Sequence, residues 1–273
     1  MMIMKFVVKL AIVASTLALI STSLLAEEGI QNNEASSASA SASGRGTALT
    51  QEEIDSSIGR YGDVDEIPEG FKFNNAEILL WHDNHLANIK KPLSLYYEFV
   101  KSGSLEDGFT DSIYLKILEL NKDGSKNAML DFFTAEKQQV VTPDNVTNIT
   151  GNPILGIYMQ GDVYEMNRLT EGHWRHFQKS IKISLREDAK VEPTTFNFNG
   201  KEYKGEKISF LPYLNDSHRR DFEKYAEKSY EFIFSDDIPG SLYQITTLIP
   251  DKSKESAEPL LLETITLVDV MDK

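Results

Sequence analysis

The stretch TTFNFNGKEYKGEKISF, residues 194–210, decides the fold. Asn199-Gly200 stands between two segments that alternate in polarity, and this combination predicts a two-residue β-hairpin. Period-two segments also occur at residues 92–103 and 111–120, and a turn at Asp123-Gly124 predicts a returning strand. Further strands are expected around residues 230–234, 243–249 and 260–268. Consecutive strands joined by short turns predict an antiparallel sheet.

Helical periodicity interrupts these strands in two places. Residues 153–187 begin with a proline, which the first turn of a helix tolerates, and Asp162 is placed to cap a continuation of that helix. A second helix there carries an apolar stripe at Trp174, Phe177, Ile181 and Leu185. Residues 215–227 predict a third helix, capped by Asn215 or Asp216. We therefore predict an α+β fold: a curved, half-barrel-like antiparallel β-sheet with a helical insertion packed on its concave face.

The N-terminal part of the chain predicts export. Residues 1–26 combine a basic start, an apolar run and small residues, which is typical of a signal peptide. Residues 27–50, rich in Ser and Ala, predict a disordered low-complexity tether, and 51–64 a short helix and linker. Residues 65–273 are expected to form a single β-rich domain. We expect a periplasmic or secreted protein with no transmembrane segment once the signal is removed.

Composition excludes several classes of function. The chain has no Cys, so thiolate zinc sites, iron–sulfur clusters and cysteine nucleophiles are excluded, and we expect no cofactor. Its formal net charge is −14, and no basic run stands out, so nucleic acid is not an expected partner. The expected partner is a hydrophobic small molecule or a protein of the cell envelope.

Four of the five histidines form two H-x-x-H pairs, His82 with His85 and His173 with His176. A metal site built from all four is one hypothesis. However, this spacing is not the H-x3-H of a metalloprotease helix, and zinc usually takes three or four ligands. We interpret these histidines as solvent-facing or capping residues.

Aromatic residues on the strands suggest a different site. Tyr97, Tyr114, Tyr230 and Tyr243 lie on strands of the predicted curved sheet, where they either fill the core or line an apolar cavity. With Arg168 and Trp174 they form the candidate ligand-binding set: Tyr97, Tyr114, Arg168, Trp174, Tyr230 and Tyr243. Arg168 would hold a ligand carboxylate or phosphate, or alternatively form a surface pair with Glu165 at i,i+3.

The segment around Ser217, His218 and Asp221 invites comparison with a catalytic triad. Neighbouring residues on a helix diverge by about 100°, so we expect Ser217 and His218 not to face each other. The chain also lacks a G-x-S-x-G nucleophile elbow. The sequence predicts no catalytic residue.

Three blocks carry a resemblance: HLANIKKPLSLYYEFVKSGSLEDGFTDSIYLKI, NPILGIYMQGDVYEMNRLTEGHWRHFQKSI and YEFIFSDDIPGSLYQI. They resemble a family of exported proteobacterial proteins of unknown function, over roughly residues 77–268. This resemblance implies an exported location and the domain limits, and it implies no mechanism. A sheet curled around helices is also similar in outline to the lipoprotein-carrier half-barrels of the periplasm, in architecture only.

These observations favour a non-catalytic exported protein that binds a lipid-like or hydrophobic ligand in the concavity of its sheet. Two alternatives remain open. The first is a metal-assisted hydrolase that uses the two histidine pairs. The second is an envelope assembly or interaction factor that acts through an edge strand or through the tether.

Overall fold

The computed structural model describes residues 72–135, 145–252 and 258–272. The predicted signal, tether and short helix within residues 1–64 lie outside the described residues. From Phe73 onward, the described residues belong to one structural unit. None of the helices in these ranges has the length and apolar character needed to cross a bilayer.

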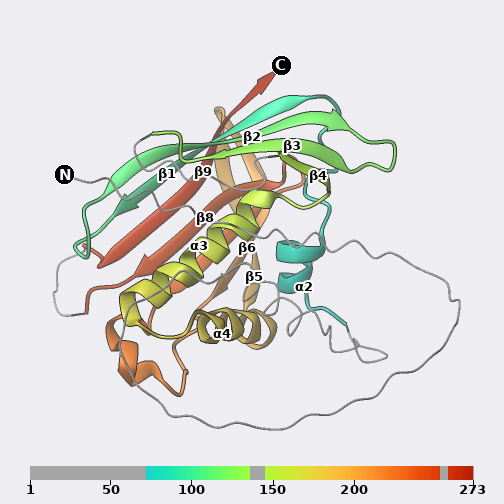
Figure 1. The fold of residues 1–273 in the computed structure, drawn as a ribbon. Coiled ribbons are helices and arrows are strands. Elements are labelled where there is room, and N and C mark those ends of the chain that lie inside the picture. The colour runs from blue at the N-terminus through green and yellow to red at the C-terminus, as the bar shows by residue number, and fades with distance from the viewer. Residues whose placement is uncertain (1–71, 136–144, 253–257, 273) are drawn as a thin grey trace, which may run out of the picture. The chain divides into compact units, whose positions relative to one another are not determined.

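One open antiparallel sheet of nine strands dominates this unit, in the order β4-β3-β2-β1-β9-β8-β7-β6-β5 (Figure 1). The strands are β1 (Leu93–Ser102), β2 (Phe109–Leu120), β3 (Lys126–Phe132), β4 (Asn145–Ile149), β5 (Lys190–Phe198), β6 (Lys201–Phe210), β7 (Ser229–Phe234), β8 (Leu242–Ile249) and β9 (Leu261–Asp272). The sheet curves, and helix α3 lies against its concave side (Figure 1). The predicted α+β architecture is confirmed, although the short edge strand β4 has no counterpart in the sequence predictions.

The concave face is apolar because the strands alternate in polarity. In β1 the buried positions are Leu93, Leu95, Tyr97 and Phe99. Their neighbours on β2 are Ile113, Leu115 and Ile117, which are fully buried. Apolar rows of this kind on the inner strands form a surface that has to be covered, and the helices cover it.

The hairpin at Asn199-Gly200 joins β5 to β6 in the predicted register, with Phe198 opposite Lys201. Asn199 has φ of 48° and Gly200 has φ of 74°. Two consecutive positive φ angles are what a type I′ turn requires, and its twist matches that of the two strands. Strand β5 is the edge of the sheet, which explains how it accommodates Pro193, a residue with no N–H to donate.

Two helices fill the insertion between β4 and β5: α3 (Pro153–Thr170) and α4 (Trp174–Glu187). Asn152 caps α3 by accepting a hydrogen bond from the N–H of Ile154. The sequence prediction that Asp162 caps a continuation is wrong, because α3 is a single helix and Asp162 lies inside it. The predicted stripe on α4 is buried at Phe177, Ile181 and Leu185.

The helix predicted at residues 215–227 is shorter and of another type. A 3-10 helix, η2 (Arg219–Tyr225), follows a series of turns, and Phe222 interrupts it with non-helical angles. Before β1, a short helix α2 (Asn75–Glu77) continues into a π-helical turn, η1 (Ile78–His82). Residues of α2 and η1 line the groove described below.

A buried ion pair joins α3 to the sheet. The ammonium of Lys228, just before β7, donates to the carboxylate of Asp162, and their side chains are 0% and 1% exposed. The hydroxyl of Tyr230, on β7, donates to the other oxygen of the same carboxylate. A buried charge is tolerated only when it is paired and hydrogen-bonded, so this contact fixes where α3 crosses β7.

The Lys228→Met variant should lose about 3–5 kcal/mol of unfolding free energy, because it leaves the Asp162 carboxylate buried without its counter-charge. A double variant, Lys228→Met with Asp162→Asn, should recover most of that loss, since asparagine still offers Tyr230 an acceptor. Urea unfolding of the two variants measures the difference. If the double variant is as unstable as the single one, the uncompensated charge is not the main cause of the loss.

Candidate functional site

A groove of about 460 Å³ lies between α3, α4 and the segment that contains α2 and η1. Its apolar wall is built by Phe73, Trp81, Met159, Val163, Ile181 and Leu185. Trp81 is 43% exposed, an unusual position for so large an apolar side chain. The volume falls within the range of about 300–1,000 Å³ that is typical of small-molecule sites.

Polar and charged residues also line this groove: Glu77, His82, Gln160, Gln178, Lys182 and Arg186. Glu77 and Arg186 line it as an ion pair, 2.9 Å from Nη2 to Oε1. The Lys182 ammonium is exposed and makes no ion pair among the described residues. The Nε2 atom of Gln160 is buried and has no hydrogen-bond partner among the residues that the structure describes. The groove therefore offers a positive charge to a bound molecule, and a turn of the Gln160 side chain would add an amide donor.

Asn74 holds the third wall of the groove in place. Its side chain accepts from the N–H of Glu77, and Glu77 in turn accepts from the N–H of Asn74, which forms a capping box. The Asn74 amide also donates to the carbonyls of Leu185 and Arg186, at the end of α4. Asn74 thus accepts from an N–H in the first turn of α2 and donates to two of the last carbonyls of α4. These hydrogen bonds join the two helices.

Two glycines in α3 lie beside pockets, although the backbone conformation requires glycine at neither position. A Cβ built on Gly156 or on Gly161 would meet no atom within 4 Å, and neither residue has a positive φ. Glycine inside a helix costs about 1 kcal/mol relative to alanine. Gly156 lines the groove, and Gly161 lines a second pocket. At both positions the absent side chain leaves open space beside the helix.

The second pocket, of about 170 Å³, lies where α3 meets β1 and β9. Phe99, Phe109, Phe132 and Phe133 line one side of it. The other side is charged: the ammonium of Lys101 lies 3.3 Å from Glu263, 3.5 Å from Glu165 and 3.1 Å from Glu106. This volume is too small for a lipid chain, but the pocket holds a concentrated network of charges.

Burial raises the pKa of Glu263 above its usual range, although the ammonium groups of Lys228 and Lys101 act in the opposite direction. The Tyr158 hydroxyl lies 3.2 Å from Glu263 Oε2 and 2.6 Å from Thr247 Oγ1. Burial and the nearby carboxylates of Glu263 and Asp162 also raise the pKa of Tyr158. A proton is therefore held more tightly at this position than in water.

The four predicted ligand tyrosines occupy two different environments. Tyr97 and Tyr230 are fully buried, and Tyr97 donates to the carbonyl of Leu242. Tyr114 and Tyr243 are partly buried, stacked on Tyr96 and on Phe196 respectively. None of the four lines either of the pockets described above. The structure therefore does not bring these side chains together at one pocket.

The other two residues of that predicted set lie near the ends of the helices. Arg168, at the end of α3, pairs with Glu165 at 2.6 Å and with Glu106 at 2.5 Å. The carboxylates of both partners hold the pKa of Arg168 well above its usual range. Trp174 is partly buried at the start of α4 and packs near Tyr164, 6.1 Å between ring centroids.

The four predicted metal-binding histidines also have different neighbours. His85 is buried and donates from Nε2 to the Leu79 carbonyl while Nδ1 accepts from the Asn152 N–H, so both ring nitrogens are in use. His82 packs against Phe73 at the groove, with the two rings tilted by 33°. His173 caps α4 by accepting from the N–H of Arg175. His176 is the exception, because its Nε2 lies 2.8 Å from Asp216.

Ser217 and His218 face each other, contrary to the sequence prediction. Ser217 Oγ lies 3.1 Å from His218 Nδ1, because residues 216–218 form a turn before η2 rather than part of a helix. The same Nδ1 is also the His218 nitrogen nearest to Asp216, at 3.6 Å. A catalytic triad uses both nitrogens of the histidine, one toward the nucleophile and one toward the carboxylate. This arrangement therefore lacks the geometry of a triad.

Sequence reasoning missed the residues that build the groove: Trp81, Gly156, Gln160 and Lys182. A usable signal was present at Gly156 and Gly161, two glycines inside a helical pattern that otherwise favours helix. Nothing in the sequence indicated that the segment before β1 would close over α3 and α4, since that contact joins residues about a hundred positions apart.

Comparison with known proteins gives little further information. No family model and no curated protein matches the chain. Among solved structures, it is similar to the crystal structure of the LolA superfamily protein NE2245 from Nitrosomonas europaea. That similarity covers 73% of this chain and 94% of the other, at 8% sequence identity and a TM-score of 0.20. The fold assignment rests on the strand order and register, and the resemblance to an exported family stays a prediction.

Replacing either helical glycine with alanine should stabilise the protein. Gly156→Ala and Gly161→Ala should each raise the unfolding free energy by about 0.5–1 kcal/mol, because alanine favours helix and its methyl meets nothing. Gly200→Ala is the matched control and should destabilise by about 1 kcal/mol, since its φ is positive. Urea titration measures all three. A loss of stability at Gly156 or Gly161 would contradict the open space beside them.

Glu263→Gln should change how stability depends on pH. Because the folded state raises the pKa of Glu263, the contribution of this group is fully present below about pH 4 and is lost as pH rises through the folded pKa. Glutamine cannot ionise, so the variant should gain stability relative to the parent as pH rises from about 4 through the folded pKa of Glu263. Thermal unfolding at several pH values measures the difference in stability between the variant and the parent. If the variant loses stability relative to the parent as pH rises, the raised pKa is contradicted.

Proposed function

We propose that the protein is a non-catalytic binding protein for a small single-chain amphiphile, with an apolar body and an anionic end. The groove between α3, α4 and the segment of residues 73–82 is the proposed site. The observation that carries this proposal is an open groove of about 460 Å³ with an apolar wall, whose rim holds polar groups without a partner among the described residues. Apolar walls with a few convergent polar groups are the usual composition of small-molecule sites.

The charge at the rim favours an anionic head group. Lys182 supplies an ammonium, and the buried Nε2 of Gln160 supplies a donor that a carboxylate or phosphate oxygen would satisfy. The carboxylate that lines the groove, Glu77, is already neutralised by Arg186. A fatty acid or a similar amphiphile meets these requirements. The site differs from the sequence hypothesis, which placed the ligand among tyrosines in the sheet.

Export to the periplasm or the cell exterior remains part of the proposal. It is supported by the basic, apolar and small-residue segments of residues 1–26. The acidic composition is consistent with a partner that is neither nucleic acid nor an anionic surface. A carrier or binding protein for amphiphiles fits these features without any catalytic group.

Gly156→Phe should block binding, because a side chain at this position enters open space in the groove wall. We expect the affinity for dansyl-labelled undecanoic acid, followed by fluorescence, to fall by more than about tenfold, or about 1.4 kcal/mol. Gly161→Phe is the matched control: it places the same ring in the same helix but beside the second pocket, and it should leave binding unchanged. Lys182→Gln should weaken binding by up to about fivefold.

Three outcomes overturn the proposal. In the first, the parent protein does not bind the probe, which would exclude this class of ligand. Gly161→Phe abolishes binding while Gly156→Phe does not, which moves the site to the second pocket. Both variants bind as tightly as the parent, which removes both pockets. Native followed by denaturing mass spectrometry of the purified parent protein would also identify a co-purified amphiphile directly.

A further inference from the structure

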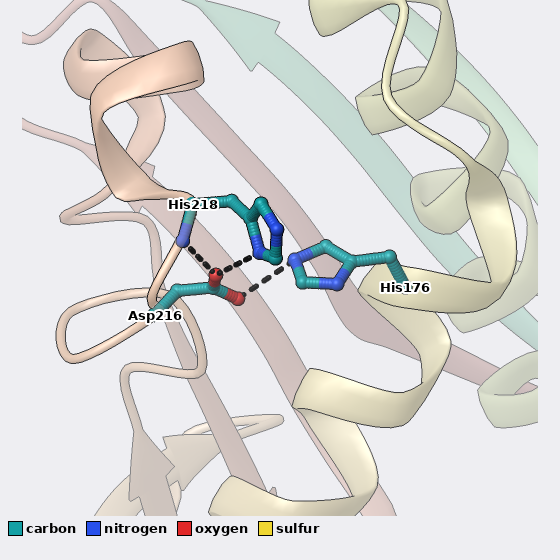
Figure 2. A group of neighbouring side chains, drawn as sticks. All are labelled: His176, Asp216 and His218. Carbon is teal, nitrogen blue, oxygen red and sulfur yellow. Dashed lines mark hydrogen bonds and ion pairs between the residues drawn. The ribbon is translucent and has the colours of Figure 1, made fainter.

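His176, Asp216 and His218 form a cluster between α4 and the turns before η2 (Figure 2). His176 comes from the first turns of α4, whereas Asp216 and His218 come from the turns before η2. His176 lies about 200° around the helix from Gln178, a residue of the groove wall, because each residue advances about 100°. The cluster is therefore independent of the proposed amphiphile site.

The distances within the cluster are those of ligands around one small ion. His176 Nε2 lies 2.8 Å from Asp216 Oδ2, and His218 Nδ1 lies 3.6 Å from Asp216 Oδ1. One potential ligand atom from each residue lies within 4.8 Å of the others. Ligands about 2.0–2.1 Å from a tetrahedral zinc ion stand about 3.3 Å apart. Small side-chain rotations would bring all three atoms to that spacing.

Hydrogen bonding does not account for the position of the His176 ring. Its Nε2 is buried and lies close to Asp216 Oδ2, yet it makes no hydrogen bond with any described residue. A buried polar atom without a partner is uncommon and calls for an explanation. A metal ion placed between the nitrogen and the carboxylate would give this nitrogen a partner.

The surrounding residues hold the central carboxylate in place. Ser180, one turn along α4, donates to Asp216 Oδ2 at 3.0 Å, and the backbone N–H of His218 donates to Oδ1 at 2.8 Å. Phe177 and Phe222 pack around the His176 ring, with centroids 5.4 Å and 6.4 Å away. Metal ligands are usually oriented by this combination of outer hydrogen bonds and apolar contacts.

We propose that His176, Asp216 and His218 bind a zinc ion. Two imidazoles and one carboxylate suit zinc rather than calcium or magnesium, which prefer oxygen ligands. Three protein ligands leave a fourth position for water. The ion would tie α4 to the turns before η2 and so fix the segment that precedes Lys228.

Calorimetric titration of the full chain with zinc tests this site, and cobalt substitution reports its geometry through visible absorption. We expect one ion per chain and a cobalt spectrum typical of tetrahedral nitrogen and oxygen ligands. His176→Ala, Asp216→Asn and His218→Ala should each weaken zinc binding by more than about 100-fold, and Ser180→Ala by about 10- to 100-fold. His82→Ala and His173→Ala are the controls and should leave affinity unchanged.

The cluster variants should keep the fold, which circular dichroism verifies. His218 is exposed, and the amide oxygen introduced by Asp216→Asn still accepts from the N–H of His218. The proposal is overturned if the parent protein binds no zinc. It is equally overturned if the three variants bind as the parent does, or if the His82 and His173 controls lose affinity as much as the cluster variants.

Discussion

The contact between Asp162 and Lys228 is the constraint on which the arrangement of helices and sheet depends. A charged pair with no exposed surface has few alternative positions, because any shift of α3 along the sheet would leave one charge without its partner. Tyr230 adds a second anchor to the same carboxylate. Apolar packing alone would allow α3 several similar positions on the concave face, and the pair selects one of them.

Both pockets follow from that fixed position. Once Asp162 points into the sheet, Gly156 and Gly161 fall on exposed faces of α3, one beside α4 and the other beside β1 and β9. A network of ion pairs joins strands β9 and β1 to the same helix: Glu263 with Lys101, Lys101 with Glu165, and Glu165 with Arg168. Ion pairs therefore extend from the sheet along α3, whereas the groove combines an apolar wall with the charged side chains of Glu77, Lys182 and Arg186.

Local rules were enough to predict the strands from their alternation, the type I′ hairpin from Asn199-Gly200, and the buried stripe of α4 from its apolar spacing. Prediction failed where contacts between distant segments determine the role of a residue. Asp162 has a helix-capping residue type, and only its encounter with a lysine 66 positions later gives it another role. At the candidate metal site the histidines were grouped by spacing along the chain, whereas the structure groups His176 with Asp216 and His218. The groove likewise depends on the closure of residues 73–82 over two distant helices.

The strand order has a further consequence for how the chain matures. Strand β9 lies between β1 and β8, so the first strand of the described sheet stays unpaired on one side until the last strand has been made. At typical synthesis rates, roughly 10 to 30 seconds separate residues 102 and 261 at the ribosome. During that interval β1 presents a long apolar edge to other chains. The completed sheet is therefore a late, nonlocal event, and until β9 is in place the open edge of β1 can pair with a strand of another chain.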